Sequence, residues 1–209
     1  MPHILHIDAS PRGDASVSRE LSREAVDALK RARVGTTVDR LDLALDAPPA
    51  IGAAAAEGTA LPPEARTPAQ AMALAEAEAL VARLKRADTV VIGTPMHNFG
   101  MPARLKSWFD AVVRAGETFA MTDAGPKGLM TRTRVLAIVA SGGDYRAGAM
   151  FEGLDHLGPH LQTLFSWMGF AEARIIHAQP TQFAGQPGRK AALAGARAEI
   201  ADYVRKAGL

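Results

Sequence analysis

The stretch ILHIDASPRGDASVS, residues 4–18, decides the fold. Its first part, Ile4–Ile7, is an apolar run of strand length, and turn residues follow it. Apolar residues then recur at helical spacing between Ser16 and Arg33. A strand that passes through a short turn into an amphipathic helix is the opening of an α/β unit.

The same unit recurs along the chain. Four more runs have strand length, at Thr36–Leu43, Thr89–Ile92, Val135–Ala140 and Arg174–Ala178. Helical patterns follow them: Thr67–Arg86, a helix starting at Pro102, Leu154–Met168 and Pro187–Lys206. Five alternating units predict a flavodoxin-like α/β fold, with a five-stranded parallel sheet of order 2-1-3-4-5 and helices on both faces. We expect residues 1–209 to form a single domain.

Two connections are too long to be simple turns. They are the Ala/Gly/Pro-rich stretch Ala44–Arg66 and the stretch Ala115–Arg134. Loops of this length are usually functional or disordered. The first has the composition of a flexible segment, and its position beside the strand ends equally suits a cover over a site or a contact with a partner subunit.

The composition excludes several classes of protein. Without cysteine there is no disulfide, thiolate metal site or cysteine nucleophile, so redox chemistry here needs a bound organic cofactor or a metal without thiolate ligands. The 24 basic and 22 acidic residues give a net charge of only +2, with no basic run, which argues against nucleic-acid binding. No run approaches the roughly 18 apolar residues of a membrane span, and no signal peptide is visible. We expect a cytoplasmic protein that has no metal site and does not bind membranes.

Hydroxyl groups gather where the first strand meets its helix. Ser10, Ser16 and Ser18 surround this helix N-terminus, and Arg12 adds a positive charge. A phosphate there would meet free backbone N–H groups and the positive end of the helix dipole. Any one of these serines alone would be interpreted as a helix cap or turn residue, but three together favour an anion. The chain lacks the glycine motifs of triphosphate and dinucleotide sites, so a phosphate monoester such as that of FMN is the better match.

The loops after the third and fourth strands suit a flavin ring. They read Gly93–Pro102 and Ala140–Tyr145. An isoalloxazine ring needs an apolar seat and hydrogen-bond donors near the edge that gains negative charge on reduction. Met96, Phe99 and Tyr145 are apolar candidates for the seat, and Asn98 offers an amide. Gly142 and Gly143 allow close backbone approach, although either loop alone would be read as an ordinary turn.

With these residues in view, the chain resembles the FMN-dependent NADH azoreductases, relatives of the quinone reductases, over nearly its full length. The matching motifs are Ser10 with Ser16-Val17-Ser18, the Pro-Met-x-Asn-Phe loop at Pro95–Phe99, Leu105-Lys106 with Phe109-Asp110, Arg114-Ala115-Gly116 with Thr118-Phe119, and Gly125-Pro126 with Gly128-Leu129. The Pro-Met-x-Asn-Phe loop is the most specific of them.

The resemblance implies a function and a site. It implies ping-pong transfer of two electrons from NADH or NADPH to quinones or azo compounds, in a homodimer whose two sites each draw on both subunits. The cofactor residues expected from motif and resemblance together are Ser10, Arg12, Ser16, Val17, Ser18, Pro95, Met96, His97, Asn98, Phe99, Ala140, Ser141, Gly142, Gly143 and Tyr145. Phe119 and Trp167 are the expected walls of the acceptor pocket, with core packing an equal alternative for Trp167.

Two positions depart from the family pattern. His97 stands where many members have tyrosine, and Ala140-Ser141 stands where many have Ser-Arg. The missing arginine changes the electrostatics at the O2 edge of a flavin. His97 is a candidate proton donor to the reduced acceptor, with packing or hydrogen bonding as its alternative role, because water can also protonate such a product.

Other functions on related folds fit less well. A one-electron flavodoxin is the nearest alternative, but such carriers usually present a strongly acidic face, and this chain is nearly neutral. A phosphorylatable receiver needs a carboxylate at the end of the third strand, where this chain has Gly93-Thr94-Pro95. A Rossmann dehydrogenase would have a glycine fingerprint after the first strand, where this chain has serines.

Overall fold

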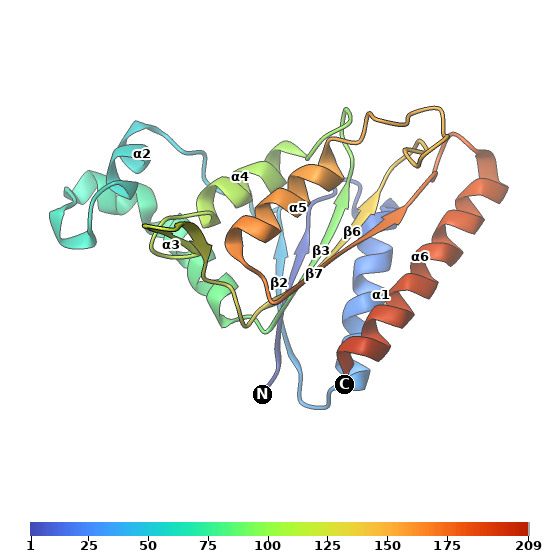
Figure 1. The fold of residues 1–209 in the computed structure, drawn as a ribbon, viewed down its shortest axis with the longest axis horizontal. Coiled ribbons are helices and arrows are strands. Elements are labelled where there is room, and N and C mark those ends of the chain that lie inside the picture. The colour runs from blue at the N-terminus through green and yellow to red at the C-terminus, as the bar shows by residue number, and fades with distance from the viewer. Residues whose placement is uncertain (209) are drawn as a thin grey trace.

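The computed structural model describes residues 1–208. A five-stranded parallel sheet forms its centre (Figure 1). The strands lie in the order β2-β1-β3-β6-β7, which is the predicted order 2-1-3-4-5. Their bounds are β1 His3–Asp8, β2 Thr37–Asp42, β3 Thr89–Pro95, β6 Arg134–Ala140 and β7 Glu172–Ala178. Because all five run the same way, the loops that follow them meet at one edge of the sheet.

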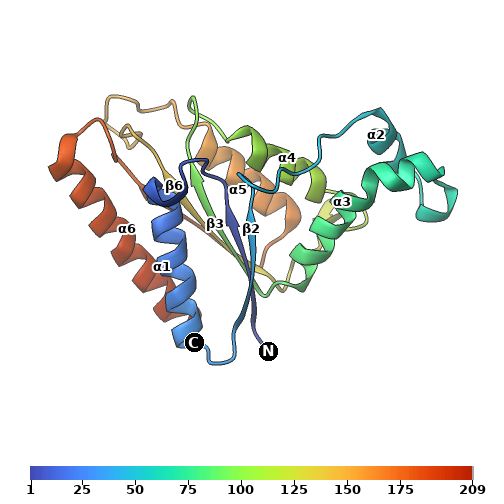
Figure 2. The same ribbon diagram turned by 180° about the vertical axis from the view of Figure 1, so that it is seen from behind.

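Helices cover both faces of this sheet (Figures 1 and 2). On one face lie α1 (Val17–Ala32) and α6 (Gly185–Gly208), which contact each other; on the other lie α3 (Pro68–Arg86), α4 (Ala103–Val112) and α5 (Leu157–Met168). Each face has its own apolar core. The first is built around Leu21 and Leu136, and the second around Trp108, Phe109 and Phe165.

Side-chain caps fix several helix ends. Thr67 and Gln70 form the predicted capping box: the Thr67 hydroxyl accepts from the Gln70 N–H at 3.3 Å, and the Gln70 side chain accepts from the Thr67 N–H at 3.0 Å. Helix α5 begins at Leu157, three residues later than predicted. The reason is that the Asp155 carboxylate accepts from the N–H groups of Leu157 and Gly158, which sets the helix start there. Helix α6 begins two residues earlier than predicted, at Gly185.

Both long connections contain regular structure that the sequence analysis did not predict. The first holds α2 (Ala53–Thr59) and a 3-10 turn, Pro63–Ala65, and α2 packs on α3. The second holds an antiparallel hairpin of β4 (Phe119–Thr122) and β5 (Gly125–Gly128). The sequence analysis described both stretches as long loops, and each proves to contain short regular elements.

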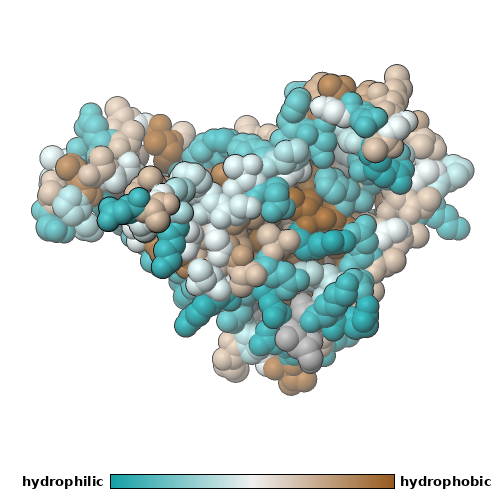
Figure 3. All heavy atoms as spheres, viewed as in Figure 1, coloured by the Kyte–Doolittle hydropathy of each residue, from teal (hydrophilic) through white to brown (hydrophobic). Residues whose placement is uncertain are grey.

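Strand β7 is an edge of the sheet and is only partly covered. A groove of about 580 Å³ lies between it and α6, lined by Ile175 and His177 on the strand and by small residues such as Gly188 and Ala192 on the helix. In Figure 3 an apolar area is exposed in the hollow between α5 and α6. Within residues 1–208, no helix has both the length and the apolar character that a membrane span requires.

Candidate active site

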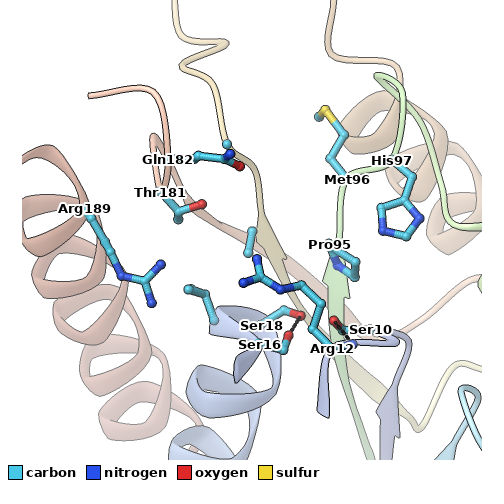
Figure 4. A pocket seen from close by; sticks show the side chains of 13 residues that line it. Ser10, Arg12, Ser16, Ser18, Pro95, Met96, His97, Thr181, Gln182 and Arg189 are labelled. Carbon is cyan, nitrogen blue, oxygen red and sulfur yellow. Dashed lines mark hydrogen bonds between the residues drawn. The ribbon is translucent and has the colours of Figure 1, made fainter. Parts of the chain in front are cut away.

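A pocket of about 450 Å³ opens at the carboxyl edge of the sheet, where β1, β3 and β6 end side by side. This edge is where parallel α/β sheets bind ligands. The pocket is lined by Ser10, Arg12, Ser16, Val17, Ser18, Pro95, Met96, His97, Ala140, Gly142, Thr181, Gln182 and Arg189 (Figure 4). Ten of these thirteen residues were expected from the sequence.

The three serines meet at the N-terminus of α1, as predicted. All three are buried. Ser16 is the N-cap, accepting from the Arg19 N–H at 3.4 Å, and its hydroxyl lies 3.1 Å from that of Ser18. The Arg12 N–H donates to the Ser10 hydroxyl at 3.3 Å. Because the first N–H groups of a helix have no partner within it, this cluster presents hydroxyls and backbone donors to the pocket. The cap and the anion roles of Ser16 are therefore compatible.

A buried network of charges holds this loop, and the sequence analysis missed it. The Arg19 guanidinium donates twice to the Ser10 carbonyl, at 2.9 and 2.6 Å, and twice to the Asp42 carboxylate, at 2.5 and 2.6 Å. It also lies 3.7 Å from Asp8, to which Arg40 donates at 2.9 Å. Arg19 thus ties the serine loop to the end of β2.

The network changes the ionisation of its carboxylates. Burial alone raises the pKa of Asp8, but the His6, Arg40 and Arg19 side chains outweigh it, so this pKa falls below its ordinary value of 3.8. The Arg19 hydrogen bonds lower the pKa of Asp42 in the same way. Both carboxylates are therefore charged at neutral pH and matched by arginines.

The loop after β3 places some of its predicted residues in the pocket and others beside it. Pro95, Met96 and His97 line the pocket. Asn98 and Phe99 do not; they form a tight turn in which both have positive φ, 47° and 69°. Such φ values are uncommon for residues other than glycine and often mark functional sites.

The loop after β6 is closely packed. Ala140 and Gly142 line the pocket, whereas Ser141 is buried and donates to the Gly143 carbonyl at 3.2 Å. A Cβ at Gly143 would lie 2.6 Å from the Phe151 ring, so any side chain here would have to displace that ring. Tyr145 stacks beside Phe151 with ring centroids 5.6 Å apart, and it contacts Phe99 edge-on at 6.5 Å. An aromatic cluster therefore adjoins the pocket.

Three pocket residues were not predicted: Thr181, Gln182 and Arg189, which follow β7 (Figure 4). The Thr181 N–H and hydroxyl donate to the Ser141 carbonyl at 2.9 and 2.8 Å, which joins this segment to the loop after β6. The available signal was topological, because the fifth strand ends at the same edge as the others.

Phe119 and Trp167 lie elsewhere in the chain. Their rings contact each other with centroids 5.4 Å apart, Phe119 on the hairpin and Trp167 on α5, and neither lines the pocket. Trp167 is 39% exposed, so it is not a core residue. The aromatic core of this face is instead Trp108 with Phe109 and Phe165.

Comparisons with known proteins place this geometry in a family. Residues 2–204 match the model of a family described as having a flavodoxin-like fold. A protein of Rhizobium etli named FMN-dependent NADH:quinone oxidoreductase 2 is 38% identical over 208 residues, 99% of this chain and 100% of that protein. The FMN-dependent NADH:quinone oxidoreductase of Laribacter hongkongensis is 36% identical over 201 residues, 96% of this chain and 99% of that protein.

Solved structures of azoreductases have the same fold as this chain. An FMN-dependent NADH-azoreductase of Bacillus anthracis, in complex with FMN, has a TM-score of 0.88 and 26% identity, with 100% of both chains covered. An azoreductase of the Sterne strain of the same species has a TM-score of 0.90 and 25% identity, with 99% of this chain and 100% of that chain covered. The chain therefore belongs to the flavodoxin-like fold family and, within it, to the FMN-dependent NADH:quinone oxidoreductases and azoreductases.

Proposed function

We propose that this protein binds FMN in the pocket at the carboxyl edge of the sheet and transfers two electrons from NADH or NADPH to quinones or aromatic azo compounds. The observation that carries the proposal is the cluster of Ser10, Ser16 and Ser18 hydroxyls at the N-terminus of α1, facing the pocket. Residues 1–209 act as one FMN-binding domain. A cytoplasmic location, where reduced nicotinamides are available, is part of the proposal.

The residues present fit this cofactor. The serine hydroxyls and the first N–H groups of α1 would hold the phosphate, because they supply donors and the positive helix end. Pro95, Met96 and Ala140 supply apolar surface in the pocket lining. When bound, FMN supplies reversible two-electron chemistry. The side chains of a protein without cysteine do not supply it. The protein's part is to bind, orient and shield the ring.

His97 is a candidate proton donor within this site. It lines the pocket, and no hydrogen bond to its ring is found within residues 1–208. Replacement by Gln keeps the size and a donor but removes the ionisation. If His97 donates the proton, His97→Gln removes an ionisation from the pH profile of kcat/KM for the acceptor; if His97 only packs, the profile keeps its shape.

We further propose a homodimer in which the Phe119–Trp167 pair walls the acceptor site of the second subunit. In the chain itself this pair does not line the pocket, and the hairpin that carries Phe119 also exposes the apolar side chain of Met121, with exposed Leu129 directly after it. A contact between copies would cover this apolar surface. A monomeric mass by sedimentation at micromolar concentration, with flavin bound and turnover intact, would contradict a shared site.

In line with the resemblance to the azoreductases, we propose that electron transfer follows a ping-pong order. The oxidised nicotinamide leaves before the acceptor binds. Initial rates with varied NADH at several fixed quinone concentrations should give parallel double-reciprocal plots. Intersecting lines would show that both substrates bind together and would contradict this part of the proposal.

The binding assignment is tested by adding a carboxylate next to the expected phosphate. Ser16→Asp and Ser18→Asp should each abolish FMN retention, because a negative charge there repels the phosphate. Ala79→Asp, on the exposed side of α3, is the matched control and should bind FMN normally. The measurement is FMN fluorescence quenching on titration with protein. Unchanged affinity in both serine variants would refute the assignment.

A further inference from the structure

Two arginines reach into the FMN pocket from opposite walls. Arg12 precedes the 3-10 turn Gly13–Ala15 after β1, and Arg189 lies in α6; Figure 4 shows both guanidinium groups extending into the space between these elements. Within residues 1–208, neither guanidinium has a hydrogen-bond or ion-pair partner. Arg12 is exposed, and Arg189 is half-buried.

The nearby carboxylates do not neutralise the two guanidinium groups of Arg12 and Arg189. The carboxylates beneath the loop, Asp8 and Asp42, are already paired with Arg19 and Arg40. A phosphate monoester carries a charge of roughly −1.5 to −2 at pH 7. Serine hydroxyls are neutral, and a helix terminus contributes only about half a charge. The serine cluster alone therefore leaves most of the phosphate charge uncompensated, and two guanidinium groups would balance it.

We propose that Arg189 and Arg12 form a two-sided clamp on the FMN phosphate, so that α6 is part of the cofactor site. This inference rests on the proposed function and extends it. Arg189 lies well outside the serine loop in sequence, and its fork of N–H donors is suited to phosphate oxygens. The clamp makes the protein select FMN over riboflavin, which has the same ring but no phosphate.

The test compares the affinities of the two flavins in matched variants. For Arg189→Ala, FMN should bind about tenfold or more weakly, as expected for lost hydrogen bonds between charged groups, while riboflavin affinity stays unchanged. Lys190→Ala removes the same charge from the neighbouring position, which does not line the pocket, and should change neither affinity. Arg189→Lys should retain part of the FMN affinity, since a single ammonium keeps the charge but loses the fork. Binding is measured by flavin fluorescence and folding by circular dichroism.

The salt dependence gives a second readout. Raising ionic strength should weaken FMN binding to the wild type more steeply than to Arg189→Ala, because a charge contact in a pocket open to solvent is screened by salt.

Each other outcome overturns a defined claim. Equal losses for FMN and riboflavin would mean that Arg189 only supports the fold. Unchanged FMN affinity, with KM raised for NADPH but not for NADH, would assign Arg189 to the 2′-phosphate of the nicotinamide instead. If Arg189→Ala binds both flavins like the wild type, the clamp is wrong and the proposed function stands. If the wild type binds neither flavin, the proposed function fails, and the clamp fails with it.

Discussion

Replacing Arg19 by Met tests whether the buried network holds the serine loop. Met keeps much of the apolar stem but removes the guanidinium. The change removes two hydrogen bonds to the Ser10 carbonyl and two to Asp42. It leaves Asp42 with the Ala44 N–H at 3.0 Å and with Arg40 at 3.9 Å.

The expected cost follows from these remaining contacts. Removing one partner of a buried ion pair usually costs about 3–5 kcal/mol, since it leaves an uncompensated charge. Because Asp42 keeps two weaker contacts and is 13% exposed, we expect the lower end, about 3 kcal/mol. The control is Arg197→Met. Arg197 pairs with Glu20 and Glu24 on α1, but it is 43% exposed, so its loss should cost at most about 1 kcal/mol.

Urea unfolding without flavin, with all proteins at one concentration, measures both changes. The fixed concentration matters because the stability of the proposed dimer would depend on it. The account also predicts weaker FMN binding in Arg19→Met, since the Ser10 loop loses its tie to β2. If Arg19→Met is no more destabilising than Arg197→Met, the network does not hold the loop, and this reasoning is wrong.

Three further predictions concern stability. The lowered pKa of Asp42 contributes stability that is present above about pH 4 and is lost as the pH falls further, so the stability gap between the wild type and Arg19→Met should narrow below pH 4 in acid-unfolding series. Gly93→Ala should lower the free energy of unfolding by about 1–3 kcal/mol and weaken FMN retention, because its Cβ would lie 2.8 Å from an α1 carbonyl. The control Gly195→Ala, in open space on α6, should be neutral or stabilising. Equal melting temperatures for the two variants would contradict this prediction. Thr67→Ala should cost about 1 kcal/mol through the lost cap, with Thr67→Ser restoring most of it in urea unfolding.

The sequence predicted the sheet order because each unit has strong local signals. Apolar runs mark the strands, and caps such as Thr67 mark the helices. The hairpin was missed because β5 reads Gly-Pro-Lys-Gly and has no apolar alternation. Helix α2 was missed because its Ala-rich sequence lies in a stretch with loop composition, and it is stabilised by packing on α3.

The parts of the site that come from continuous stretches of sequence were predictable. The serine loop and the loops after β3 and β6 are continuous stretches that lie at known strand ends. Arg19 was missed because its partner Asp42 is 23 residues away, and helical spacing shows only that Arg19 belongs to α1. Arg189 was missed because the predicted site comprised only the loops after the first, third and fourth strands, whereas Arg189 follows the fifth strand, β7. Long-range contacts such as that of Arg19 with Asp42 leave no periodic signal in one sequence.

The central claim is that bound FMN is reduced by a nicotinamide and oxidised by an acceptor. The direct measurement is an absorbance spectrum of the protein after addition of FMN and desalting, followed by anaerobic NADH and then a quinone. The account predicts flavin bands that are retained, bleach with NADH and return with the quinone. Bands that are retained but stay oxidised with NADH would indicate an electron carrier instead, and loss of all flavin on desalting would contradict the cofactor site itself.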